Sequence, residues 1–416
     1  MTDSYPIRPV SAEEYPAFTA VLGEAFLEPW PPEAAAVERG VLEFDRTIAA
    51  VDGAEIVGTA TSYSFAMTVP GASARAAGIS EVSVRPSYRR RGILTAMMRH
   101  QMRDARSRGE AIAILFASES GIYARYGFGL ASWYLRLQIG RGDGAMRTGA
   151  ALGQADSPSL RAVQPAQARE RLAQVYATAL PGRPGMLARD DHWWEAMLAD
   201  PPALRDGMSP LRGLLAENAT GPVGYALYRT KPSWQDGVAT GTLRLRELVA
   251  TDPAAIASLW SDLLDRDLVS EVVAPSRPID DPLLALLADP RRTHALVSDA
   301  LWVRLIDLPG ALCQRRYATA VDIVLDVIDP VLPDNAGRWR LHSGEPANGG
   351  EAVCERTSRP ADVVLTVQAA GAAYLGGASF GQLVGAGHVR ELTPGAAGRL
   401  AAAMSFDLAP WTCQIF

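Results

Sequence analysis

The sequence predicts a mixed α/β (α+β) protein in which two tandem copies of one fold precede a third, different α+β domain. Two patterns indicate this: an imperfect internal repeat, and a series of alternating apolar and polar segments towards the C-terminus. Length is the third observation, because 416 residues exceed the ~100–200 residues of a typical single domain. With 48% hydrophobic residues, the chain can fill several cores, which excludes a mainly disordered protein.

The repeat pairs Ile7–Ser11 with Leu160–Gln164, and each segment reads as a short strand that runs into an amphipathic helix. Further along, Glu81 corresponds to Glu247, 166 positions later, within segments that both read as strands. We therefore expect one fold twice, over residues 1–150 and 151–292. The Gly- and Ala-rich segment 141–159 would join the two copies.

The third region contains the segments VDIVLDVI, RWRLHSG, EAVCERT and DVVLTVQ, which are separated by turn residues. Such alternation indicates an antiparallel sheet, and the Ala- and Gly-rich segments that follow indicate helices packed against it. We expect this domain to span residues 293–416.

Charge and cysteine content exclude several classes of protein. A net charge of −6 argues against a general nucleic-acid binder and suits a small cationic substrate better. Cys313, Cys354 and Cys413 cannot form a disulfide scaffold in a chain of this length, which favours a reducing cytoplasm. The N-terminus lacks the pattern of a signal peptide, and the uncharged stretch Val363–Gly387 is too rich in glycine and polar residues for a membrane span. The five histidines lie far apart, so no metal site is expected.

One turn carries a specific chemical signal. The segment Arg89–Leu94, RRRGIL, follows the strand-like Val82–Val84 and opens a predicted helix. A helix start has unpaired N–H groups and a positive dipole end, and a glycine there lets an anion approach the backbone. The turn therefore predicts an anion site, with a solvated basic helix start as the alternative. In the second copy Ala255–Ser258 replace Arg89–Gly92, so no such site is expected there.

This strand and turn resemble the GNAT acetyltransferase superfamily, in which the strand hydrogen-bonds the pantetheine of acetyl-CoA and an R-x-x-G turn holds its pyrophosphate. Leu94 stands where the general pattern has Gly or Ala. The run Arg89–Leu94, followed by ASESGIY at Ala117–Tyr123, is similar to the enhanced intracellular survival (Eis) branch of that superfamily. The resemblance covers the whole chain. It implies a GNAT domain with an acetyl-CoA site, a degenerate GNAT-like domain without one, and a sterol-carrier-protein-like domain whose C-terminus enters the active site.

The resemblance implies an acetyl-CoA-dependent N-acetyltransferase, which is an acyltransferase. It would transfer acetyl directly to a primary amine of a small cationic molecule such as an aminoglycoside, a polyamine or a lysine-type amine. It also implies a homo-oligomer, a hexamer by family resemblance. The net charge and the composition described above argue against nucleic-acid and membrane partners. The residues implied to contact acetyl-CoA are Val82, Ser83, Val84, Arg90, Arg91, Gly92, Ile93, Leu94, Thr95, Ser118 and Glu119.

Acetyl transfer needs a base for the amine and an acid for the leaving thiolate. The resemblance assigns the acid to Tyr123, although Tyr126 would share its face if the segment is helical, and it assigns the base to the C-terminal carboxylate of Phe416. Glu81 is a rival base, since many GNAT enzymes keep a glutamate on this strand. The matching Glu247 favours a structural role for Glu81 instead.

The resemblance also places the acceptor near Phe26, Glu28, Trp30 and Glu81, where an acid and aromatic rings would hold a cation; a surface loop is the alternative for the segment around Glu28. Ile415 stands where the best-known branch members carry an acid, so polycation binding should be weaker. Two functions of other classes stay open. One is an acetyl-CoA-binding regulatory protein without turnover, and the other is a lipid or small-molecule carrier whose cavity is lined by residues 369–387.

Overall fold

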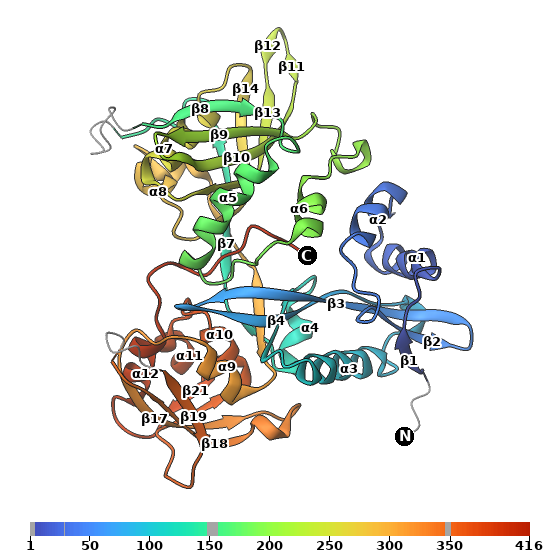
Figure 1. Ribbon diagram of the computed structural model, residues 1–416, viewed down its shortest axis with the longest axis vertical. Coiled ribbons are helices and arrows are strands. Elements are labelled where there is room, and N and C mark those ends of the chain that lie inside the picture. The colour runs from blue at the N-terminus through green and yellow to red at the C-terminus, as the bar shows by residue number, and fades with distance from the viewer. Residues whose placement is uncertain (1–4, 29, 148–156, 346–350) are drawn as a thin grey trace. The chain divides into compact units, whose positions relative to one another are not determined.

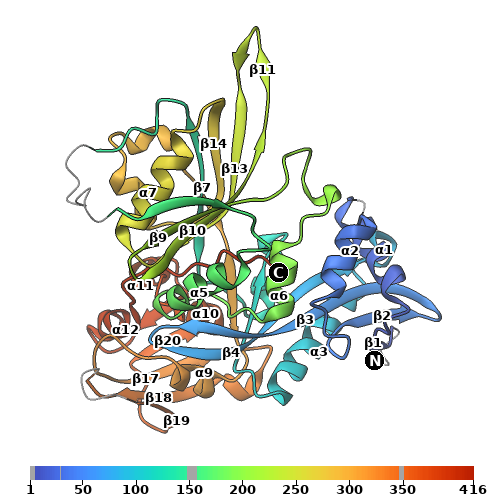
Figure 2. The same ribbon diagram turned by 45° about the horizontal axis from the view of Figure 1, so that its top comes forward.

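The computed structural model describes residues 5–28, 30–147, 157–345 and 351–416 (Figures 1 and 2). They fall into two compact units. The first comprises the described residues up to Ser132, together with Ala300–Pro410 and Gln414–Phe416; the second comprises Trp133–Asp299 and Trp411–Cys413. The boundary expected between residues 150 and 151 lies outside the described residues. Sheets and helices build both units, which confirms the mixed α/β class.

The first unit contains a seven-stranded sheet, within the described residues, in the order β1-β2-β3-β4-β5-β16-β6. Its strands are β1 (Ile7–Pro9), β2 (Ile48–Asp52), β3 (Glu55–Val69), β4 (Ala72–Val84), β5 (Ile112–Phe116), β6 (Gly129–Leu130) and β16 (Leu301–Leu305). The helices that accompany it are α1 (Tyr15–Phe26), α2 (Pro32–Arg39), α3 (Ile93–Ser107) and α4 (Ser120–Tyr123), with 3-10 turns at Pro86–Tyr88 and Ala124–Tyr126.

Helices cover both faces of this sheet, with α1 and α2 on one side and α3 on the other (Figure 1). Alternation along β2 explains the division, since Ala49 and Val51 pack in the cluster of α1, whereas Ile48 and Ala50 pack in the cluster of α3. On α3 the buried face includes Met97, Met98 and Met102, as its helical spacing predicts.

In the C-terminal part of the first unit, the residues that the structure describes form a five-stranded sheet in the order β19-β18-β17-β20-β21. Its elements are α9 (Leu308–Gln314), β17 (Val321–Ile328), a 3-10 turn at Pro333–Asn335, β18 (Gly337–Ser343), β19 (Ala352–Arg356), β20 (Val363–Thr366), α10 (Val367–Ala373), α11 (Phe380–Gly385), β21 (Val389–Glu391) and α12 (Ala396–Met404). The predicted strands are present, but the expectation of a purely antiparallel sheet is wrong. Strand β20 lies on the opposite side of β17 from β18 and pairs with β17 in parallel, so the chain crosses over the sheet between β19 and β20.

The Ala- and Gly-rich segment after β20 packs tightly against the first sheet. A Cβ on Gly371 of α10 would lie 2.3 Å from the carbonyl oxygen of Val303, and one on Gly129 would lie 1.9 Å from the carbonyl oxygen of Gln368. Small residues are therefore required here because a helix and two strands approach each other closely. Because these residues are packed against the sheet, the N-terminal part of segment 369–387 does not line a cavity of the kind that the carrier hypothesis requires.

The second unit also contains a seven-stranded sheet within the described residues, in the order β15-β7-β14-β13-β10-β9-β8. Its elements are β7 (Trp133–Gly140), β8 (Ser159–Val163), α5 (Arg169–Ala179), α6 (Asp191–Leu198), β9 (Arg212–Asn218), β10 (Gly221–Lys231), β11 (Trp234–Gln235), β12 (Val238–Ala239), β13 (Gly241–Ala250), α7 (Pro253–Leu264), β14 (Val269–Pro278), α8 (Leu283–Leu286) and β15 (Leu296–Asp299), with 3-10 turns at Leu180–Gly182, Pro202–Leu204 and Pro290–Thr293. The β11–β12 hairpin extends beyond the end of this sheet (Figure 2).

The two sheets repeat one strand order, as the internal repeat predicts. Read from β8, the second sheet runs β8-β9-β10-β13-β14-β7-β15, and each position matches one of the first sheet read from β1. In both sheets a strand from outside the repeat, β16 or β7, occupies the sixth position. No helix in the described part of the chain is long and apolar enough to cross a membrane.

Candidate active site

The candidate site forms where β4 and β5 separate. These two parallel strands pair only from Ala76 to Gly78 on β4, opposite Ile112 to Ile114 on β5. Beyond Gly78 the backbone of β4 has no partner from β5, so its peptide groups can bind another extended molecule. A pocket of ≈ 250 Å³ opens there. Its lining residues are Phe26, Ile79, Ser80, Glu81, Val82, Phe116, Ala117, Ser118 and Tyr123.

The turn before α3 has the features of an anion site. Gly92 is its N-cap with φ of +84°, which favours glycine, and no side chain caps the helix. A Cβ on Gly92 would meet no atom within 4 Å, so the backbone is open to an approaching group. Arg90 is exposed, whereas the Arg91 guanidinium donates to the Tyr5 hydroxyl at 2.9 Å. The structure thus brings free backbone donors and a mobile cation together at one helix start.

Tyr123 and Tyr126 differ in what their hydroxyl groups face. Tyr123 is the last residue of α4 and lines the pocket, while the Tyr126 hydroxyl shares a hydrogen bond of 3.1 Å with Thr95. Burial raises the pKa of Tyr123, although a hydrogen bond with Ser118 acts in the opposite direction. A protonated phenol beside the pocket can act as a general acid.

The C-terminal Phe416 docks on the same sheet. Its ring centroid lies 4.9 Å from that of Phe65, 5.5 Å from that of Phe116 and 6.3 Å from that of Tyr63. Gly78 makes room, since a Cβ there would lie 2.4 Å from the Phe65 ring and 3.0 Å from the Phe416 ring. The aromatic setting fixes the chain end at the point where β4 and β5 separate. Phe416 was identified from the sequence, but the aromatic rings around it were not. Tyr63 and Phe65 are two positions apart on one strand and therefore share a face, which could have indicated an aromatic cluster.

Glu81 lies at a β-bulge, where one extra residue of β4 interrupts the pairing with β3 between Ser80 and Ser83. Its φ of +53° is left-handed. Burial and the charge of Glu38 raise the pKa of Glu81 to about 8, despite a hydrogen bond from Tyr63. The glutamate can therefore exchange a proton near neutral pH. Glu38 was not found from the sequence, because nothing in a helical acidic residue signals that its carboxylate is partly buried.

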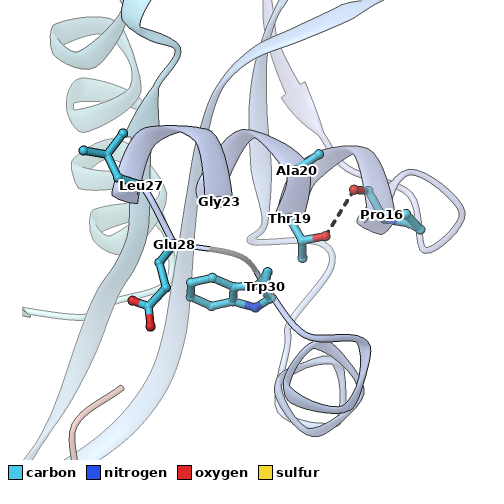
Figure 3. A pocket seen from close by; sticks show the side chains of 7 residues that line it. All are labelled: Pro16, Thr19, Ala20, Gly23, Leu27, Glu28 and Trp30. Atoms are coloured by element: carbon cyan, nitrogen blue, oxygen red, sulfur yellow. Dashed lines mark hydrogen bonds between the residues drawn. The ribbon is translucent and has the colours of Figure 1, made fainter. Parts of the chain in front are cut away.

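The residues expected to hold the acceptor divide between two hollows. Phe26 and Glu81 line the pocket between β4 and β5, whereas Glu28 and Trp30 line a second hollow of ≈ 450 Å³ along α1 (Figure 3). In Figure 3 the Glu28 carboxylate and the Trp30 ring lie on the same side of α1, while Leu27 points away. The Trp30 Nε1 donates to Glu38 at 2.7 Å, and the charge of Glu38 in turn acts on Glu81 of the first pocket.

The second copy differs from the first at the helix start and at the glutamate that corresponds to Glu81. The start of α7 is capped by Asp252, whose carboxylate accepts from the N–H groups of Ala254 at 2.6 Å and Ala255 at 3.3 Å. An anionic side chain therefore occupies the place that the turn before α3 leaves open. Glu247 is paired with the guanidinium of Arg189 at 2.7 Å, unlike Glu81. The described residues contain no group of side chains that could hold a metal ion.

A repeated sheet whose fourth and fifth strands separate over a pocket, next to an uncapped basic helix turn, is the architecture of a GNAT acetyltransferase. Family models agree with this class. Two acetyltransferase (GNAT) domain models match residues 6–131 and 185–305, and a sterol carrier protein domain model matches residues 308–413.

The similarity to relatives of this class extends over almost the whole chain. An uncharacterized N-acetyltransferase of Streptomyces avermitilis is 45% identical over 89% of each chain. The N-acetyltransferase Eis of Mycobacterium tuberculosis is 31% identical over 95% of this chain and 96% of its own. The crystal structure of Eis1 from Mycobacterium abscessus aligns with a TM-score of 0.83 at 32% identity, covering 99% of this chain and 100% of that one. The chain therefore belongs to the Eis family of GNAT N-acetyltransferases.

Proposed function

We propose that this enzyme transfers the acetyl group of acetyl-CoA directly to a primary amine of a small cationic molecule. The observation that carries the proposal is one pocket that joins a protonated tyrosine, Tyr123, to the unpaired edge of β4, the strand that leads along the chain to the uncapped helix start at Gly92. The peptide groups of Val82–Val84 and the turn Arg89–Thr95 would bind the pantetheine and pyrophosphate, with Ser118 and Glu119 beside them. Phosphate groups suit a helix start whose N–H groups have no internal partner.

In the proposed reaction the neutral amine nitrogen attacks the thioester carbonyl carbon. The C–S bond then breaks, Tyr123 donates its proton to the departing thiolate, and the carboxylate of Phe416 takes the proton lost by the nitrogen. Glu81 is the alternative base, and its ability to exchange a proton near pH 8 supports that alternative. Phe26, Glu28, Trp30 and Glu81 would surround the acceptor.

We also propose that the enzyme works in a reducing cytoplasm as a homo-oligomer, a hexamer by family resemblance, with a small-molecule partner and no nucleic acid. Free thiols at Cys313, Cys354 and Cys413 support the reducing compartment.

One assay distinguishes an enzyme from an acetyl-CoA sensor without turnover. Purified protein is mixed with acetyl-CoA and aminoglycosides, polyamines, lysine-bearing peptides or arylalkylamines, and release of free thiol is followed. Release with one class of amine names the acceptor type. Binding of acetyl-CoA without release from any mixture would favour the sensor.

Tyr123→Phe tests the assigned acid. The substitution keeps the buried ring but removes the proton, so turnover should fall at least ~100-fold while the Kd for acetyl-CoA stays within a factor of ~2. Tyr126→Phe is the matched control, because that hydroxyl bonds Thr95, and it should lose far less activity. Equal losses in both variants would contradict the assignment of Tyr123.

A further inference from the structure

The second copy also has a point where two parallel strands separate. Strands β13 and β14 pair from Gly241 to Arg244 of β13, and Arg244 corresponds to Gly78, the last residue of β4 that pairs with β5. Beyond Gly78 the first copy opens into a pocket that the next residues of β4 line. The second copy uses the corresponding backbone differently, because one of its own side chains binds there.

That side chain is Arg277, which bridges β13 and β14 beyond the point of separation. Its Nη1 donates to the carbonyl oxygen of Leu248 at 2.9 Å, and its Nε donates to Asp281 at 2.6 Å. Leu248 corresponds to Val82, which lines the pocket of the first copy. The guanidinium therefore takes a backbone acceptor that an extended ligand would need, and Asp281 balances its charge.

The end of the chain packs on the same guanidinium. The Cζ atom of Arg277 lies 5.2 Å from the ring centroid of Trp411 and 5.7 Å from that of Trp260. Trp411 is only 4% exposed, and its backbone N–H donates to the carbonyl oxygen of Pro184 at 2.9 Å. A buried cation near two aromatic rings stabilises both ring positions. Trp411 is thus built into the second unit.

Two further contacts hold the same tail segment. Gly185 has φ of +96°, and a Cβ there would lie 3.1 Å from the carbonyl oxygen and 3.2 Å from the nitrogen of Trp411. Glycine therefore suits both the left-handed backbone and the close approach of the two chains. Two residues on, Cys413 Sγ accepts from Arg189 at 3.5 Å, and Glu247 holds the Arg189 guanidinium at 2.7 Å.

We propose that these residues of the second unit, Pro184, Gly185, Arg189 and Arg277, form a socket that positions the C-terminal carboxylate for catalysis. The C-terminal socket binds Trp411–Cys413 in the place where the first copy has its open pocket. A copy that lost its own ligand would in this way serve the reaction of the other copy.

The inference rests on the proposed function, in which Phe416 supplies the base. From Cys413 the chain continues into the first unit as Gln414–Phe416. Three extended residues span at most ~10 Å, so an anchored Cys413 restricts where the Phe416 carboxylate can lie. A displacement of about 1 Å at a reacting group can cost ~100-fold in rate. The socket residues are therefore positioning residues, which act through Trp411 and Cys413.

Gly185→Ala tests the socket, because its methyl group would push against the backbone of Trp411. With an amine identified by thiol release, kcat should fall at least ~10-fold, while the Kd for acetyl-CoA stays within a factor of ~2. Added formate should restore part of the turnover, since a free carboxylate can take the proton of the amine, whereas Tyr123→Phe should not respond to formate. Gly182→Ala is the matched control, because a Cβ there meets no atom within 4 Å.

Labelling of Cys413 gives a readout that does not depend on turnover. Burial raises the pKa of this thiol to about 12, so iodoacetamide should modify it slowly in the wild type. In Gly185→Ala the rate at Cys413, followed by mass spectrometry, should rise at least ~10-fold, while the rate at the exposed Cys313 stays unchanged.

A second variant keeps the test independent of strain at Gly185. Trp411→Ala removes the ring over Arg277 and should lower kcat and expose Cys413 in the same way, whereas Trp234→Ala, at an exposed tryptophan of β11, should do neither. Unchanged labelling of Cys413 in both variants, or faster labelling with full kcat, would overturn the inference. If the wild type acetylates no amine but both variants expose Cys413, the proposed function fails and the socket stands.

Discussion

Glu81 and Glu247 occupy matching positions in two copies of one fold, yet their surroundings give them opposite acidities. Glu81 has a pKa raised to about 8 by burial and by Glu38, whereas the charge of Arg189 overcomes burial and lowers the pKa of Glu247. The difference comes from the neighbours on other elements. Tyr225 contacts Glu247 from the position that Thr59 occupies in the first copy, whereas the Thr59 hydroxyl bonds the backbone carbonyl oxygen of Glu81 at 2.8 Å and the Ser83 hydroxyl at 2.6 Å.

The raised pKa of Glu81 predicts a pH-dependent stability. The folded protein binds a proton that the unfolded chain releases above its ordinary pKa of 4.5, so Glu81 contributes stability at low pH that is lost as the pH rises towards 8. Glu81→Gln removes this dependence. The Tm of the variant minus that of the wild type should therefore increase by a few degrees between pH 5 and pH 9.

Thermal scans of both proteins over that pH range measure this difference. The exposed Glu33→Gln serves as the control and should give a difference that does not change with pH. A flat difference for Glu81→Gln as well would mean that Glu81 is ionised in the folded protein throughout the range.

Individual residues were predictable from the sequence only where a motif contained them. The turn at Arg89–Leu94 and the segment ending at Tyr123 stood out from their residue types and spacing. Glu38 did not, because its role depends on Trp30 and Tyr15, which reach it from α1 and the loop beyond it. A hydrogen bond between side chains on different elements leaves no periodic signal in a single sequence.

At the scale of elements, α3 and α7 show how much a helix start can reveal. Their apolar spacing predicted both helices, and Met97 and Leu259 are fully buried. The open start of α3 was evident from Gly92. The closed start of α7 was also encoded, since Asp252 followed by Pro253 is a typical N-cap and N1 pair. The absence of an anion site there was predicted only from the replacement of Arg89–Gly92 by Ala255–Ser258.

The C-terminal segment is an element with two anchors. Trp411–Cys413 belong to the second unit, where Trp411 N–H donates to Pro184 at 2.9 Å, and Gln414–Phe416 belong to the first. Extending the chain beyond Phe416 converts its carboxylate into a peptide group, which has no basic oxygen of comparable strength. If Phe416 supplies the base, a four-residue extension should lower turnover at least ~100-fold.

Thiol-release kinetics of the extended enzyme measure this loss, and the same four residues added before Met1 provide the control. Retained binding of acetyl-CoA would show that the site is intact. An extended enzyme with full activity would transfer the role of base to Glu81.

At the scale of the whole molecule, each sheet is completed by a strand from outside its own repeat. Strand β16 follows the second copy in sequence but lies between β5 and β6 of the first sheet. Strand β7 precedes the second copy in sequence but lies between β14 and β15 of the second sheet. The sequence predicted that one fold occurs twice. It could not predict this exchange, because alternation in a short strand such as LWVRL identifies a strand without identifying its partner. The expected domain limits at 150 and 292 stay predictions.

The position of β16 predicts that residues 1–150 do not fold alone. Leu301–Leu305 pair with the whole of β5, and Trp302 packs in the core with Ile79 and Tyr123. Among the described residues, β6 pairs only with β16. Without β16, the edge of β5 is unpaired and this core is open, so the fragment should aggregate or lack cooperative thermal unfolding.

A linked chain that keeps β16 is the control. Ala300 N–H donates to the Ser132 carbonyl at 3.0 Å, so a short Gly/Ser linker can join these residues. A chain of residues 5–132, linker and 300–410 should then unfold cooperatively in circular dichroism scans. Cooperative unfolding of the 1–150 fragment would show that β16 is dispensable for the first sheet.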